Sequence, residues 1–139
     1  MSLAFAAATS FAVVAPAGRA TAAPGVATAD EIAAMNRRAS DEYESLNFDK
    51  ARNTLTAALE SCQRAGLARH RVAADAHLLM GLVILAGGVK QSDEAAAEFR
   101  RALEIRPSIQ VPERLANPEI QQVFAQAAAT AAALSQSAD

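Results

Sequence analysis

The two histidines, His70 and His77, are candidates for chemistry, because imidazole binds metals and transfers protons. They lie seven positions apart in the chain. Metal ligands on one helix are usually three or four residues apart, with more carboxylates or thiols nearby, and Asp75 does not complete such a set. We therefore expect two ordinary helix residues, with no metal site and no cofactor.

The single cysteine, Cys62, has no partner for an internal disulfide. It could pair between chains, but a free cysteine usually packs as a small buried hydrophobe, and we expect the latter. No Ser or Cys has a neighbouring base suited to nucleophilic catalysis, and Gly87-Gly88 is typical of a helix stop rather than a phosphate loop. The acidic residues Asp41, Glu42 and Glu44 would spread around a solvated helix face, so we do not expect them to act as general acids. The sequence therefore predicts a protein that is not an enzyme.

The arginines at 100, 101 and 106 form a short basic run, but Glu98 and Glu104 are interleaved with it, so we expect ion pairs within one helix.

The net charge of the 139-residue chain is −2. No overall basic field favours nucleic acid or an anionic lipid surface. Hydrophobic residues make up 52% of the chain and aromatic residues only 4%. Such an alanine-rich composition favours closely packed helices over strands.

Apolar residues recur at steps of three and four along five segments, which predicts an all-α protein of about five helices. Thr28 and Glu31 have the spacing of a capping box before a first helix of about 16 residues. Further helices are expected over about 48–64, 68–86, 93–105 and 118–134, with Gly66 as a stop and Asn117 as a cap. The segment 78–86 is apolar on nearly every side. We expect it to lie between several neighbours.

Two helix pairs repeat one pattern. The spacing of Ala51, Leu55 and Ala58 returns 44 residues later as Ala95, Phe99 and Ala102. With Gly81 in the preceding helix and Pro107 at the end, the pattern resembles the tetratricopeptide repeat family. The resemblance covers residues 29–107 as two divergent hairpins and implies a short antiparallel helix-turn-helix solenoid. Residues 108–134 would then form a proline-containing link and a capping helix, and residues 135–139 a frayed tail.

In that family the first helices of the units line a concave surface that receives peptides. The resemblance therefore implies a partner-binding surface, whose expected residues are Arg37, Asp41, Glu44, Asp75, Leu78, Leu82 and Leu85. Alternatively, the three leucines are covered by the capping helix. The Lys and Asn pattern of the family's carboxylate-clamping subgroup is absent, so recognition of a C-terminal carboxylate is not expected.

Residues 1–22 have the features of a secretory signal, because an apolar run from Leu3 to Ala15 is followed by the small residues Ala20-Thr21-Ala22. The run is too short to span a bilayer, so no stable membrane span is expected after its removal. A secretory signal usually has a positively charged residue before its apolar run, but no Lys or Arg precedes this one. Either the true start lies upstream, or the segment is a disordered alanine-rich leader. We expect a bacterial protein that is periplasmic or secreted; if the segment is only a disordered leader, the protein is cytoplasmic.

Taken together, these features predict a non-catalytic protein–protein interaction module or scaffold with a protein or peptide partner. One alternative is a self-assembling structural subunit, in which the apolar faces of the third and fifth helices pair between copies and give weak self-association. Another is that the chain is the N-terminal interaction part of a larger protein, because the alanine-rich ending would suit a linker.

Overall fold

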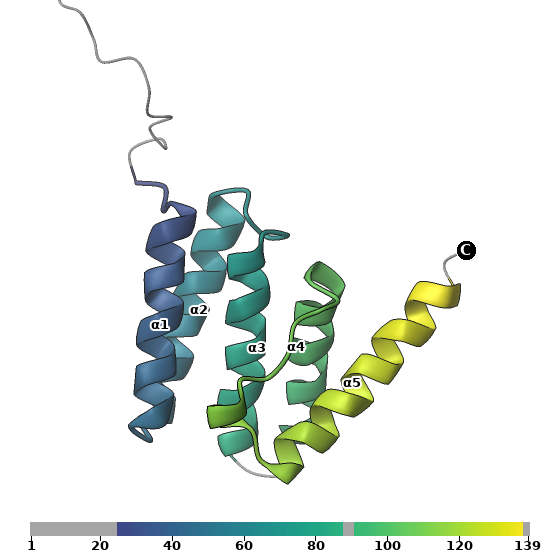
Figure 1. The fold of residues 1–139 in the computed structure, drawn as a ribbon. Helices are drawn as coiled ribbons and strands as arrows, with labels where there is room; N and C mark the ends of the chain where they lie inside the picture. Colours follow the sequence, from purple (N-terminus) through teal and green to yellow (C-terminus); the bar gives the residue numbers. More distant parts are fainter. Residues whose placement is uncertain (1–24, 88–90, 138–139) are drawn as a thin grey trace, which may run out of the picture.

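The computed structural model describes residues 25–87 and 91–137, and within them the chain is helical without strands (Figure 1). Its elements are α1 (Ala29–Glu44), α2 (Phe48–Arg64), α3 (Arg71–Ala86), α4 (Ser92–Ile105), the 3-10 helix η2 (Glu113–Leu115) and α5 (Pro118–Ser137). The predicted all-α class with about five helices is confirmed. Helices α1 to α4 lie side by side in antiparallel order, an arrangement like that of helical repeats. The expected leader, residues 1–22, lies outside the described residues.

The helix ends follow from local hydrogen bonding. Thr28 and Glu31 form the predicted capping box, in which each side chain accepts from the other residue's backbone N–H. Asn117 Oδ1 accepts from the Ile120 N–H at 2.8 Å, as its capping role requires. Helix α3 begins at Arg71 rather than near Ala68, because His70 Nδ1 accepts from a backbone N–H in its first turn.

Helix α3 lies at the centre of the molecule, in contact with α1, α2 and α4. Its buried residues cover every side of the helix, as the sequence predicted. Gly81 of α3 allows α4 to pack closely against α3. A Cβ atom at this position would lie 2.4 Å from Phe99 Cε1, so only glycine leaves room for the aromatic ring. Phe99 is fully buried and its ring meets Phe124 of α5 edge to face, with 5.5 Å between the ring centroids.

Residues 106–117 connect α4 to α5, and we call this connection the strap. It runs back along the bundle, so that α5 starts at the lower end in Figure 1 and runs in the same direction as α4. Antiparallel order therefore ends at α4. Helix α5 packs against α4 through its first half and continues to Ser137, so residues 135–137 are helical where a frayed tail was expected.

Replacing Phe99 with alanine should lower the free energy of unfolding by about 3–5 kcal/mol, because the change empties a fully buried aromatic site between α3, α4 and α5. Thermal and urea unfolding followed by circular dichroism would measure the loss. Leu134→Ala is the control, because Leu134 is 52% exposed and its truncation should change stability by only about 0.5 kcal/mol. Similar losses for the two variants would contradict the packing described above.

Candidate functional site

The strap lies along α1 and α3, on the face where the sequence predicted a concave surface. Its apolar residues Ile109, Val111 and Leu115 are buried in the main core cluster. Its two arginines reach the helices. Arg106 lies 3.7 Å from an Asp75 carboxylate oxygen, and Arg114 forms an ion pair with Glu44. Arg114 also donates to Ser40 Oγ at 3.2 Å. The chain thus covers part of this face with its own residues.

Two hollows remain beside the strap, and Arg114 and Leu115 belong to the walls of both. The inner hollow, with a volume of about 250 Å³, is lined by Ala33, Asn36, Arg37, Ser40, Asp75, Leu78, Leu79, Pro112, Arg114 and Leu115. The Asn36 side-chain N–H donates to the Val72 carbonyl at 2.9 Å. Its Oδ1 is buried and has no hydrogen-bond partner among the described residues. An unpaired buried acceptor is costly, and this oxygen has almost no exposed surface through which a bound molecule could reach it.

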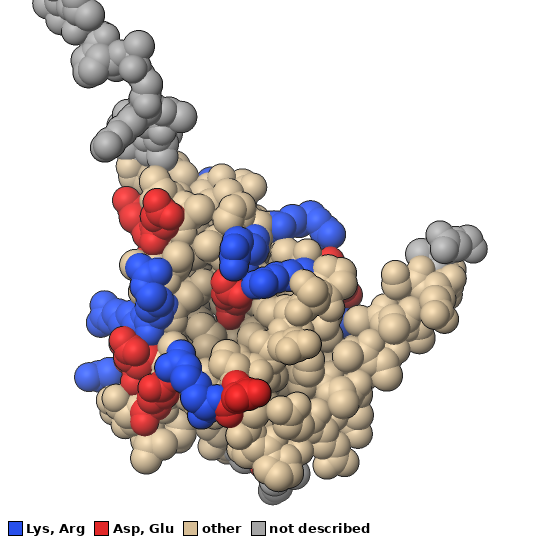
Figure 2. Space-filling model, viewed as in Figure 1, with Lys and Arg blue, Asp and Glu red and all other residues tan. Residues whose placement is uncertain are grey.

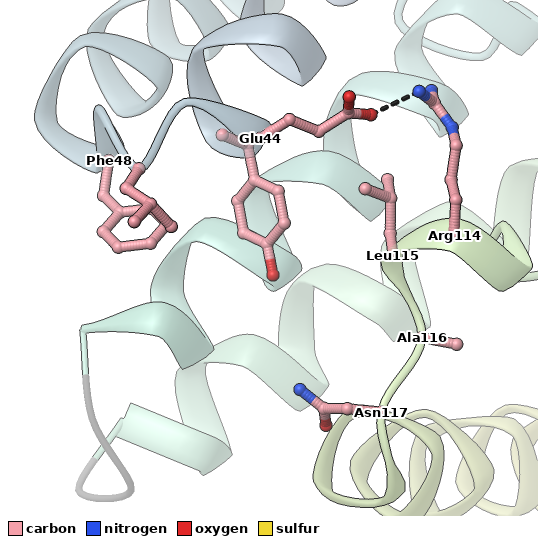
Figure 3. A pocket seen from close by; sticks show the side chains of 8 residues that line it. Glu44, Phe48, Arg114, Leu115, Ala116 and Asn117 are labelled. Atoms are coloured by element: carbon pink, nitrogen blue, oxygen red, sulfur yellow. Dashed lines mark hydrogen bonds and ion pairs between the residues drawn. The ribbon is translucent and has the colours of Figure 1, made fainter.

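The end hollow has a volume of about 440 Å³ and lies where α1 turns into α2. It is lined by Tyr43, Glu44, Leu46, Phe48, Arg114, Leu115, Ala116 and Asn117. Figure 3 shows Glu44 and Arg114 pointing toward one another across it, with Phe48 on the α2 side and Asn117 on the strap side. The rings of Tyr43 and Phe48 pack edge to face at 5.5 Å. Burial raises the pKa of the Tyr43 hydroxyl, so this group stays protonated and can donate a hydrogen bond.

The structure brings together most, but not all, of the residues that the sequence predicted. Arg37, Asp75 and Leu78 line the inner hollow, and Glu44 lines the end hollow. Asp41 is exposed on α1 between Arg37 and Glu44.

Leu82 and Leu85 do not line either hollow, so the prediction that they bind a partner is wrong. They are 0% and 6% exposed and belong to the core cluster that also contains Leu115 of the strap and Ile120 of α5. They offer no surface to a partner, and Leu78, which is 5% exposed, offers only its edge. The alternative named the capping helix as the cover, but α3 is covered mainly by α1, α2 and α4. A helix surrounded by neighbours has no free face on which both could be exposed.

Sequence reasoning missed Asn36, Ser40 and Arg114. Asn36 and Ser40 lie on a helix face that the apolar pattern left out, and each is buried because α3 and the strap cover it. Arg114 is 70 positions away from Glu44 in the chain, so no local spacing connects them. The sequence did contain one sign that the strap packs against the helices. Between two prolines, Ile109 and Val111 alternate with polar residues, which is typical of an extended segment with one buried face.

The remaining chemically capable side chains have structural roles. His77 Nδ1 lies 2.6 Å from Glu98 Oε2, which ties α3 to α4. Arg100 and Arg101 pair with Glu104 and Glu98 inside α4, as predicted. No group of three His, Cys, Asp or Glu side chains within residues 25–87 and 91–137 is arranged to hold a metal ion.

Cys62 is 1% exposed and lies beside a hollow that His77 and Glu98 also line. Burial raises the pKa of its thiol, which keeps the sulfur protonated and weakly nucleophilic. This environment suits packing better than catalysis.

Figure 2 shows basic and acidic side chains interspersed over α1, α3 and the strap, whereas α5 presents an almost uncharged surface. Glu119 is the one charged residue of α5.

None of the helices in the described part of the chain is both long enough and apolar enough to span a membrane. Comparison with protein-family models, with curated proteins and with solved structures finds no match to this chain.

The strap should be held mainly by apolar burial rather than by its ion pairs. Ile109→Ala should lower the free energy of unfolding by about 2–5 kcal/mol, because it leaves a cavity in the core. Arg114→Ala should cost only about 0–1 kcal/mol, because the Arg114 side chain is 61% exposed and water screens its ion pair. Urea unfolding of both variants measures the difference, and the reverse order of the two losses would show that the ion pair holds the strap.

Proposed function

We propose that this protein is a non-catalytic protein–protein interaction module that binds a segment of another protein at the inner hollow. The composition of that hollow carries the proposal. Leu79 and the edges of Leu78 and Leu115 supply apolar surface, and the charged side chains of Arg37, Asp75 and Arg114 lie around it. A peptide offers apolar side chains together with charged and backbone polar groups, which suits such a mixed lining. The tetratricopeptide resemblance supports the same face as the receiving surface.

The size and rigidity of the inner hollow support a peptide rather than a cofactor. Its volume of about 250 Å³ is below the roughly 300–1,000 Å³ of most small-molecule sites. One or two side chains of a partner would fill it. Asn36 and Ser40 are only 6% and 7% exposed, so packing already fixes their positions. A site formed before binding loses less conformational entropy when the partner arrives.

The charges beside the hollow indicate which partner sequence fits best. Arg106 and Arg114 already pair with Asp75 and Glu44. Arg37 is exposed and forms no salt bridge within the described residues. A carboxylate on the partner would supply the missing countercharge and add specificity and association rate. We therefore expect a segment in which an acidic residue lies close to an apolar one.

The partner proposal predicts that charge reversal at Arg37 disrupts capture. Tagged protein, crosslinked in the cells that express it and analysed by mass spectrometry, should recover a distinct partner. Arg37→Glu should weaken binding by about tenfold, or roughly 1.4 kcal/mol, and should therefore reduce that recovery.

Arg64→Glu is the matched control, because it makes the same charge change at an exposed position near the end of α2. Equal recovery by the two folded variants would contradict the assignment of the inner hollow.

We also propose that the protein acts outside the cytoplasm, in the bacterial cell envelope or medium. The apolar run and the Ala20-Thr21-Ala22 sequence support export. Residues 1–28 fused to an alkaline phosphatase that is active only after export should give enzyme activity and a processed product that begins at Ala23. Ala22→Leu should block processing, because the cleavage site takes small residues. An inactive, full-length fusion would place the protein in the cytoplasm.

A further inference from the structure

Two helices of this protein end in the same hydrogen-bonded turn with different residues at its critical position. After α1, the Asn47 N–H donates to the Glu42 carbonyl and the Leu46 N–H to the Tyr43 carbonyl. After α2, Leu67 and Gly66 make the equivalent pair of bonds. Both turns are Schellman motifs, which place one residue in the left-handed region. That residue is Gly66 in one turn, with φ of +69°, and Leu46 in the other, with φ of +63°.

Leu46 is disfavoured in this place on two grounds. A side chain makes the left-handed conformation unfavourable, which is why glycine usually fills the position. Burial does not offset the strain, because Leu46 is 73% exposed. Within residues 25–87 and 91–137, the large hydrophobic residues that are exposed are Leu46 and Leu134. Strain together with an exposed apolar side chain indicates that Leu46 is used in an interaction outside its own chain.

The surroundings of Leu46 identify the kind of partner. The side chain borders the end hollow, whose aromatic residues Tyr43 and Phe48 supply apolar surface. The same patch carries one acidic and one basic residue, Glu44 and Arg114, which already pair with each other within the chain. A patch that holds a protruding leucine beside a hollow presents a second copy with both a side chain to bury and the space that receives one. In a two-fold dimer each such feature meets its counterpart from the other chain.

We propose that the end hollow is a homotypic interface, in which Leu46 of each copy enters the end hollow of a second copy of this chain. Glu44 and Arg114 already pair within each chain, so apolar burial rather than charge holds this interface. This interface is separate from the binding of another protein at the inner hollow and does not depend on it. It also differs from pairing through α3 and α5, because α3 is buried.

Sedimentation velocity of the full chain over a wide concentration range tests the proposal. The wild type should show a reversible monomer–dimer equilibrium. Leu46→Gly should weaken the dimer by at least about tenfold. Its melting temperature should stay at or above that of the wild type at a concentration where both are monomeric, because glycine relieves the strain at this position. Loss of association without loss of stability separates an interface residue from a structural one.

Leu134→Ala is the matched control, since it removes the other exposed leucine, and it should dimerise like the wild type. Three results would overturn the proposal: a wild type that stays monomeric throughout, a Leu46→Gly variant that associates unchanged, or loss of association in Leu134→Ala, which would place the interface on α5.

Discussion

The burial of α3 is the constraint on which the rest of the structure depends. Eleven of its sixteen residues are buried, so this helix must be covered on every side to keep its apolar surface from water. Helices α1, α2 and α4 supply three neighbours. Close approach of α4 requires glycine at position 81, because the Phe99 ring occupies the space of a side chain there. The side that these helices leave uncovered is where the strap lies.

The strap covers part of an open helical face and leaves two smaller hollows. By burying Ile109, Val111 and Leu115 it closes the core, and by bringing Arg114 to Glu44 it divides the remaining surface into an inner and an end hollow. It also sets the direction of α5, which follows α4 instead of opposing it. A longer solenoid would present a continuous concave surface. Here part of that surface is occupied by the chain itself.

The two hollows differ in lining. The inner hollow includes an exposed arginine, Arg37, that forms no salt bridge within the described residues. The end hollow lies beside a strained, exposed leucine, and its two charged residues pair with each other. Arg114 and Leu115 belong to the walls of both hollows.

The sequence by itself determined the helices and their ends, because capping bonds such as Thr28 to Glu31 and apolar steps of three and four act within a few residues. The repeat pattern also predicted that Arg37, Asp75 and Leu78 share one face, and these residues line the inner hollow. Only the tertiary structure decided that Leu82 and Leu85 are core, that Asn36 lacks a partner, and that Arg114 reaches Glu44 across 70 positions. These outcomes depend on where the strap lies. Its path is set by which surface of α3 remains uncovered after the helices have packed, and no local spacing encodes that.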